Sequence, residues 1–351
     1  MGFKLSIFSI IIALAVTSCV STPAFKDKEG KALEGSIAVI EKVPIGGIDQ
    51  WLFIRGEDAS RPVLLFLHGG PGSPEASLVR AFCPDLERIF MVVHWEQRMS
   101  GKSYSGTTPG ESITVDQYVR DTLELTEYLR KRFERDKIYL MGHSWGSILG
   151  VLTVKRDPRP YHAFIGIGQV VHQLEGEEIS YDYVMSKAKE NKDKRAIRRL
   201  EKIGRPPYPQ ERIVSSLWKE RKLVIKYGGA FYSEENRKKI MRARYILCQE
   251  EYNFSDKINW IRGQVYLCRN LFDKILAIDL REAASKLEVP AYFFQGIHDY
   301  QTPAVLVKDY FGMLDAPRKE LFLFENSAHS PIFEEPERFI ELVRDTVLKG
   351  R

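Results

Sequence analysis

Unbroken apolar runs of strand length, alternating with helix-like stretches, constrain this 351-residue chain more than any other feature. The runs in its first half are Val63 to His68, Phe90 to Trp95, Ile138 to Gly142 and Ala163 to Gly168. A strand with one face in water alternates apolar and polar residues, whereas a strand covered on both faces is apolar throughout. Helix-favouring stretches separate the runs, among them residues 115–133 and 147–155. The chain is therefore predicted to be an α/β protein with a mostly parallel central sheet and helices on both faces.

The strand pattern is interrupted once, which predicts how the chain is divided. Residues 36–55 are typical of a β-hairpin that precedes the parallel strands. Apolar strand runs stop after Gly168 and return at Val289, and the segment between them is charged and helix-favouring. We therefore predict a helical cap over residues 169–287, inserted between a first core part at 36–168 and a second at 288–351.

The N-terminal residues have the layout of an export signal. A positive charge at Lys4 is followed by an apolar run from Leu5 to Val16 that is too short to span a bilayer comfortably. Residues 16–19, Val-Thr-Ser-Cys, resemble the lipobox of bacterial lipoproteins, which implies a signal peptide over 1–18, cleavage before Cys19 and lipid on its thiol and amino group. Residues 19–35 would then be a flexible linker, and the protein would be anchored to a membrane of the bacterial cell envelope. A conventional signal with an incidental cysteine is the alternative.

Charge and cysteine content disfavour two kinds of function, nucleic-acid binding and metal binding. The net charge of +5 comes from dispersed basic residues, which is too mild to indicate nucleic acid as a partner. Beyond Cys19, the cysteines are Cys83, Cys248 and Cys268, an odd number that permits at most one internal disulfide. None has metal-ligand spacing, so buried free thiols are the default interpretation and no metal is expected.

A serine follows one of the buried strands in a pattern that carries chemistry. Residues 142–146, Gly-His-Ser-Trp-Gly, fit G-x-S-x-G between the apolar run at Ile138 and a helix. Glycines flank the serine because a sharp strand-to-helix turn brings backbone against backbone. The pattern alone is weak, since it could be a simple tight turn. In this context it predicts a nucleophile elbow that presents the Ser144 hydroxyl above the sheet.

An activated serine needs a base and an acid to orient it, and both occur at later strand ends. Asp299 follows the apolar run that ends at Gly296, and His329 follows the run that ends at Asn326. Either residue alone could be a turn or capping residue. Ligands of a parallel sheet bind beyond the carboxyl ends of its strands, so these residues and Ser144 are predicted to meet there as a catalytic triad.

A glycine-rich loop follows the first parallel strand. Residues 68–72, His-Gly-Gly-Pro-Gly, let backbone N–H groups approach a ligand closely. An acyl-transfer site needs such donors to stabilise the oxyanion, and we expect the amides of Gly70 and Trp145 to provide them. A phosphate loop is disfavoured because no Gly-Lys-Ser/Thr follows.

Together these segments resemble the proline iminopeptidase branch of the α/β-hydrolase superfamily. The resemblance is carried by HGGPG, HWEQRMSGKS at 94–103, GHSWGS, GIHDYQTP at 296–303 and SAHSP. It implies Ser144 as nucleophile, Asp299 and His329 as its partners, hydrolysis through an acyl-enzyme, and no cofactor. The resemblance covers the two core parts and not the cap.

The chain departs from the family pattern where substrate would bind. Family members commonly have Asp-Gln-Arg-Gly where this chain has Glu-Gln-Arg-Met at 96–99, and the cap lacks the usual tryptophan-rich stretch. An aminopeptidase must neutralise the substrate's ammonium group with a carboxylate. The candidate carboxylates are at positions 96, 175, 177, 178, 250 and 251, and we expect Glu96, Glu175 and Glu178 to contribute.

The leading interpretation is a lipid-anchored serine hydrolase that removes N-terminal residues, preferably proline, from short peptides. A carboxylesterase or amidase with the same triad is the alternative, because both reactions pass through the same oxyanion. A binding protein on a catalytically inactive hydrolase scaffold is a third possibility, favoured only by Met99 in place of the family glycine.

Overall fold

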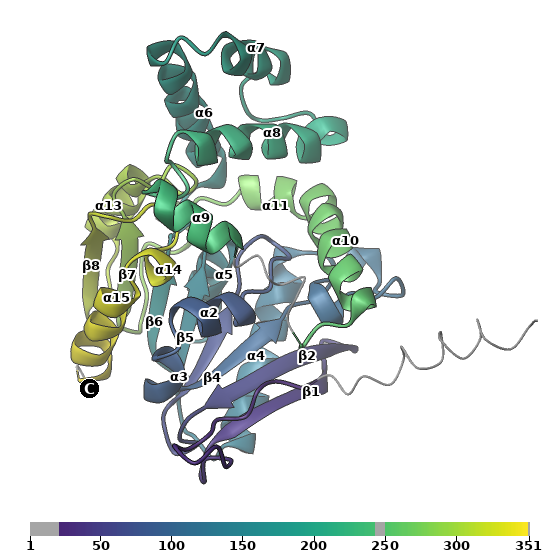
Figure 1. The fold of residues 1–351 in the computed structure, drawn as a ribbon, viewed down its shortest axis with the longest axis vertical. Helices are drawn as coiled ribbons and strands as arrows, with labels where there is room; N and C mark the ends of the chain where they lie inside the picture. Colours follow the sequence, from purple (N-terminus) through teal and green to yellow (C-terminus); the bar gives the residue numbers. More distant parts are fainter. Residues whose placement is uncertain (1–20, 243–249, 350–351) are drawn as a thin grey trace, which may run out of the picture.

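The computed structural model describes residues 21–242 and 250–349, and it contains one sheet of eight strands in the order β1-β2-β4-β3-β5-β6-β7-β8 (Figure 1). Strands β1 and β2 are antiparallel to each other, β2 is antiparallel to β4, and all later neighbours are parallel. The predicted mostly parallel sheet is therefore confirmed. The strands are β1 Ile37–Ile45, β2 Ile48–Gly56, β3 Val63–Leu67, β4 Met91–Glu96, β5 Ile138–His143, β6 Tyr161–Ile167, β7 Ala291–Gly296 and β8 Lys319–Phe324.

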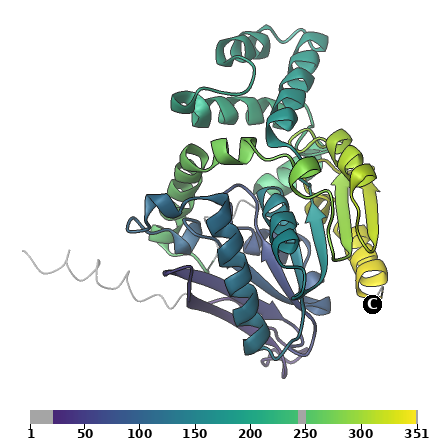
Figure 2. The same cartoon turned by 180° about the vertical axis from the view of Figure 1, so that it is seen from behind.

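Helices cover both faces of the sheet, which explains why its central strands are apolar throughout. In β3, Leu65 and Leu67 pack into one apolar core and Leu64 and Phe66 into another, on opposite faces. Figures 1 and 2 show these faces from the two sides. The face that holds Leu65 and Leu67 is covered by α4 Val115–Arg132, α5 Trp145–Arg156 and α13 Ala304–Met313. The face that holds Leu64 and Phe66 is covered by α2 Ala76–Phe82, α3 Leu86–Ile89, α14 Pro331–Glu334 and α15 Pro336–Leu342. A π-helical turn, Val343–Leu348, extends α15.

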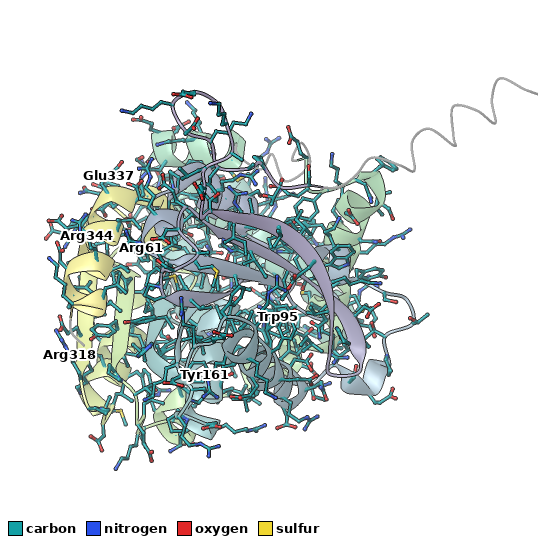
Figure 3. All side chains as sticks on the ribbon, turned by 90° about the horizontal axis from the view of Figure 1, so that it is seen from below. Arg61, Trp95, Tyr161, Arg318, Glu337 and Arg344 are labelled. Carbon is teal, nitrogen blue, oxygen red and sulfur yellow. The ribbon has the colours of Figure 1, made fainter. Side chains whose placement is uncertain are left out.

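The view from the side opposite the cap shows how polar and apolar side chains separate (Figure 3). Trp95 and Tyr161 lie inside the molecule and are each 1% exposed. The charged residues Arg318, Glu337 and Arg344 lie at the rim, beside the C-terminal helix.

A helical cap lies between β6 and β7, over the carboxyl ends of the strands (Figure 1). The cap helices are α6 Gln173–Glu190, α7 Lys194–Ile203, α8 Ile213–Lys226, α9 Glu234–Arg242, α10 Phe254–Asn270, α11 Phe272–Leu276 and α12 Leu280–Ala283. The first three helices of the cap, α6, α7 and α8, share an apolar core of their own, in which Val184, Leu200, Leu217 and Val224 are buried. Short 3₁₀ turns occur at Gly101–Ser103, Gly110–Ser112 and Gln210–Arg212.

Thr22, in the segment predicted as a flexible linker, is packed on the core, whereas most of residues 23–35 are exposed. Thr22 is 7% exposed, and its hydroxyl accepts a hydrogen bond from Arg55 Nη1 at 2.6 Å and donates one to Glu251 Oε1 at 3.2 Å. The composition of the segment suggested a solvated spacer because its polar side chains gave no sign of these distant partners.

The predicted signal peptide and Cys19 lie outside the described residues, as does Cys248. Within the part of the chain that the structure describes, no helix is both long enough and apolar enough to cross a membrane. Cys83 and Cys268 are free thiols.

Candidate active site

Ser144 lies at the turn between β5 and α5, in a strained backbone conformation. Its φ of 53° and ψ of −120° are backbone angles that residues other than glycine rarely adopt, as expected of a nucleophile elbow. A Cβ on Gly142 would lie 2.1 Å from Gly146 O, and one on Gly146 would lie 2.0 Å from Leu67 O. Both positions therefore require glycine, because the turn forces the start of α5 against its neighbours.

His329 and Asp299 form a buried hydrogen-bonded pair in the loops after β8 and β7. His329 Nδ1 lies 2.9 Å from Asp299 Oδ2, and the Thr302 hydroxyl donates to the same oxygen at 2.6 Å. The Thr302 backbone N–H donates to Asp299 Oδ1 at 2.9 Å. Burial raises the pKa of Asp299, but the His329 imidazole and the Thr302 donors lower it by more, so that the pKa lies below its ordinary value. Asp299 is thus held as a carboxylate that orients the imidazole.

The fold brings this pair beside the serine. The Ser144 N–H donates to Ile167 O at the end of β6, and a Cβ on Gly168, the residue that follows Ile167, would lie 3.1 Å from ring atoms of His329. The imidazoles of His143 and His329 have their centroids 5.0 Å apart. The three residues predicted from strand ends therefore converge at one edge of the sheet, as the topology of parallel strands requires.

The glycine loop after β3 lies directly over the elbow. A Cβ on Gly69 would lie 3.2 Å from Ser144 Cβ, and Gly70 has a φ of +116° that few other residues adopt. Trp145 is the first residue of α5, so that its N–H has no partner within the helix. Among residues 21–242 and 250–349, the amides of Gly70 and Trp145 have no hydrogen-bond acceptor.

A buried pair that we did not predict joins the glycine loop to the elbow. Glu75 Oε1 lies 2.7 Å from His143 Nδ1, and Glu75 Oε2 accepts from the Gly69 N–H at 3.1 Å. Burial raises the pKa of Glu75, but the His143 imidazole lowers it by more, so the pKa of Glu75 lies below its ordinary value. Burial lowers the pKa of His143, but the Glu75 carboxylate raises it by more, so the pKa of His143 lies above its ordinary value. Both net shifts favour the ion pair. His143 Nε2 also lies 3.2 Å from His329 O, so the pair joins the glycine loop, the elbow and the loop that carries His329.

The segment after β4 supports the glycine loop from the other side. Gln97 Oε1 accepts from the Trp145 indole at 2.8 Å, and Gln97 Nε2 donates to His68 O at 3.2 Å. Glu96, predicted as a substrate ligand, is 1% exposed, and its carboxylate accepts hydrogen bonds from the Tyr252 hydroxyl and the Lys102 N–H. Burial raises the pKa of Glu96 to about 8.

Met99 occupies a position that explains the family's glycine. Its φ is 62°, in the left-handed region where glycine is favoured. The side chain is 3% exposed and packs in the core on the α4 and α5 face of the sheet. Its burial in the core compensates for a strained backbone.

The other two predicted substrate ligands have partners of their own. Glu175 Oε2 accepts from Arg281 Nη2 at 2.6 Å, and its side chain is 37% exposed. The Glu178 side chain is 38% exposed and lies 3.8 Å from Arg205.

Two buried carboxylates and one guanidinium form a cluster inside the cap. Glu177 on α6 and Glu220 on α8 are 1% and 0% exposed, and both lie beside Arg221. Glu177 Oε2, Glu220 Oε1 and Arg221 Nη1 have no hydrogen-bond partner among the described residues. Burial and the like charge of Glu177 raise the pKa of Glu220 to about 7. The cluster therefore holds two carboxyl groups beside one guanidinium and has unused hydrogen-bonding capacity.

A chain of contacts links this cluster to Asp299. Gln173 Nε2 donates to Glu177 Oε1 at 2.5 Å. Gln173 also lines a small cavity with Val170 and Thr302, and Thr302 contacts Asp299. Glu177 follows Gln173 by one helical turn, so both lie on the same face of α6.

The comparisons with known proteins agree with this geometry. The family model described as serine aminopeptidase, S33, matches residues 58–336. The chain belongs to the S33 serine aminopeptidase family. Its eight-stranded sheet and helices are those of the α/β-hydrolase fold.

The similarity to known proteins extends over most of this chain. Probable aminopeptidase YbaC of Bacillus subtilis is 34% identical over 304 residues, which cover 87% of this chain and 94% of the relative. A proline iminopeptidase of Heyndrickxia coagulans is 23% identical and covers 82% of this chain and 91% of its own length. A solved proline iminopeptidase-related protein from Thermus thermophilus has a TM-score of 0.62 at 19% identity, covering 88% of this chain and 96% of its own.

Within this S33 family member, no group of three or more potential metal ligands occurs among the described residues. The side chains around Ser144 supply a hydroxyl, an imidazole and a carboxylate, which is the chemistry of nucleophilic catalysis.

Proposed function

We propose that this protein is a serine hydrolase that works through an acyl-enzyme, with Ser144 as the nucleophile. His329 Nε2 accepts the proton as Ser144 Oγ attacks the substrate carbonyl, while Nδ1–H remains bonded to Asp299 Oδ2. The Gly70 and Trp145 amides donate to the developing oxyanion. His329 then protonates the leaving amine, and a water activated by the same imidazole hydrolyses the acyl-enzyme.

The substrate proposed for this site is a short peptide with a free N-terminus, and the Glu177 and Glu220 cluster is the observation that carries the proposal. One guanidinium can neutralise one of the two carboxylates, and the raised pKa of Glu220 reflects the cost of a second buried negative charge. A substrate ammonium would supply the missing positive charge and the missing donors. An ester or an N-acylated amide would supply neither.

A preference for N-terminal proline is the finer part of the proposal. Its support is the family resemblance of the core segments and relatives that are named proline iminopeptidases. Proline, alanine and leucine naphthylamides compared at equal concentration would test it, and equal kcat/KM for all three would reject the preference.

The amine anchor is tested by a pair of neighbouring substitutions. Glu177→Gln removes a buried charge, and we expect it to raise KM for aminoacyl naphthylamides by about 10- to 100-fold, the worth of a charge-assisted hydrogen bond. Glu178→Gln is the matched control, since this side chain is 38% exposed. Turnover of short nitrophenyl esters by Glu177→Gln should be unchanged. Equal effects on amines and esters would contradict the anchor, and ester-only activity of the unmodified protein would reject the aminopeptidase.

The nucleophile is tested by fluorophosphonate labelling. Ser144→Ala should abolish labelling, whereas Ser215→Ala in the exposed part of α8 should leave it unchanged. Labelling that survives Ser144→Ala would show that another residue reacts.

Lipid attachment at Cys19, and with it a place in the bacterial cell envelope, is also part of the proposal. Its support is the signal-like sequence of residues 1–18 and the Val-Thr-Ser-Cys pattern. Mass spectrometry of the native N-terminus should find an acylated Cys19, and an unmodified terminus would reject it.

A further inference from the structure

The outward face of α10 carries an apolar stripe with no partner among the described residues. Phe254 is 79% exposed and Ile261 is 46% exposed. Ile258 and Val265 are partly exposed. Positions 254, 258, 261 and 265 follow the spacing of one helical face, so the four side chains form a continuous line.

Basic residues flank this stripe, and no acidic side chain interrupts it. Lys257 precedes the stripe on one side, and the exposed Arg262 and Arg269 follow it on the other. The one carboxylate of α10 is Asp256, which points to the opposite side and accepts from Lys102 Nζ at 2.5 Å. An apolar line between basic margins is typical of a helix that lies in a membrane interface.

The inner face of α10 is held firmly on the core. Leu267 is fully buried, and Gly263 lies so close to the core that a Cβ there would be 2.1 Å from Met99 O. A capping box between Asn253 and Asp256 defines the first turn. The stripe is therefore a fixed surface and cannot turn inward to bury itself.

The N-terminal segment reaches the core beside the start of this helix. Thr22 donates to Glu251, which lies three positions before Phe254, and Arg80 also contacts both Thr22 and Glu251. Cys19 precedes Thr22 by three residues, a reach of about 10 Å at full extension. Lipid on Cys19 would place the bilayer close to this end of α10.

We propose that the outer face of α10 lies on the surface of an anionic lipid bilayer, with Phe254 and Ile261 in the acyl boundary and the basic margins at the headgroups. For the direction of approach, this inference draws on the proposed lipid attachment. The α10 contact would fix the orientation of the protein on the membrane, because a lipid at Cys19 and a helix face at Phe254 hold it at two places. Figures 1 and 2 show α10 at one side of the molecule and α13 at the other.

Orientation has a consequence for the site. The inner face of α10 contacts the glycine loop, where a Cβ on Gly72 would lie 3.2 Å from the Gln264 backbone, and Gln264 bonds to Ser73. The helix thus separates the bilayer from the oxyanion loop.

A second copy of the chain is a poorer occupant than lipid. A stable protein interface buries about 800 Å² on each partner around an apolar centre, whereas this helix is about 26 Å long and carries a single line of apolar side chains. Like-charged margins would also face each other across a two-fold axis.

The test measures which face of the full chain touches lipid. Phe254→Trp is compared with Met313→Trp, a residue 58% exposed on α13, after binding to phosphatidylcholine and phosphatidylglycerol vesicles with brominated acyl chains. Bromine quenches tryptophan that enters the acyl region, and each signal is read as the increment over the native tryptophans. We expect quenching of the added tryptophan at 254 several-fold above that at 313. Equal quenching, or none at 254 in vesicle-bound protein, would overturn the proposal.

Further variants separate this inference from the lipid attachment and from self-association. Cys19→Ser tests attachment, and if Cys19 proves unmodified while 254 is still quenched, the α10 contact stands without the anchor. Phe254→Ser with Ile261→Ser should weaken binding to anionic vesicles about tenfold or more, whereas Val305→Ser with Met313→Ser should not. A dimer that the Phe254 and Ile261 variant dissociates, with unchanged vesicle binding, would assign the face to a second copy and overturn the proposal.

Discussion

Replacing Glu75 should destabilise the protein by about 3–5 kcal/mol, the cost of leaving one partner of a buried ion pair alone. In Glu75→Ala, His143 loses its counterion at 2.7 Å and the Gly69 N–H loses an acceptor at 3.1 Å. The lost acceptor alone costs about 1–3 kcal/mol. The side chains of His143 and Glu75 are 4% and 9% exposed, so water can replace few of the lost interactions.

The coupling between the two residues is measurable by a double-mutant cycle. His143→Ala strands the carboxylate in the same way, and the double variant removes both charges together. We expect the double variant to be less destabilised than the sum of the single variants by about 1–3 kcal/mol. Urea unfolding followed by tryptophan fluorescence measures each free energy of unfolding.

The pH dependence gives a second, independent check. The pKa of His143 is raised, so its contribution is present below its ordinary value of 6.5 and is lost as pH rises through its folded value. The pKa of Glu75 is lowered, so its contribution is present above its ordinary value of 4.5 and is lost as pH falls through its folded value. The difference between the wild type and Glu75→Ala should therefore be largest between these limits and shrink at alkaline pH. Additive single effects, or a constant difference from acid to alkaline pH, would refute the ion pair.

Other predictions follow from single contacts. Because burial raises the pKa of Glu96 to about 8, the folded state holds a proton that the unfolded state releases above pH 4.5, and Tm should fall as pH rises between these values. In Glu96→Gln this decline should flatten, and an unchanged slope would contradict it. Gly146→Ala should slow fluorophosphonate labelling about 100-fold by shifting the elbow, while Gly312→Ala, in open space, should not; similar rates would argue against steric control. Thr302→Val removes a donor to Asp299 and should move the acid limb of the kcat/KM profile to higher pH, which a pH–rate series would detect.

The strand-end positions of Ser144, Asp299 and His329 were predictable because they depend on local rules. Apolar runs define the strands, and parallel strands put their carboxyl ends at one edge, so residues after β5, β7 and β8 had to lie near one another. The elbow glycines were equally readable, since a sharp turn excludes side chains whatever the rest of the chain does. The burial of Thr22 was not predictable, because its contacts with Arg55 and Glu251 leave no local pattern.

Glu75 and His143 were not predictable as a pair. They lie 68 positions apart, and Glu75 in sequence resembles a solvated residue before a short helix. A carboxylate becomes a buried ion-pair partner only when the glycine loop folds over the elbow.

The sequence by itself determined the α/β-hydrolase sheet, the inserted cap and the strand-end positions of Ser144, Asp299 and His329, because hydrophobic periodicity and turn sterics act over a few residues. The tertiary structure decided which glutamate near the start of α6 is buried. Glu175 and Glu178 remain partly exposed, while Glu177 between them is 1% exposed beside Arg221. Neighbouring positions on a helix differ by about 100° in direction, so only the packing of α6 against α8 selects the carboxylate that faces inward.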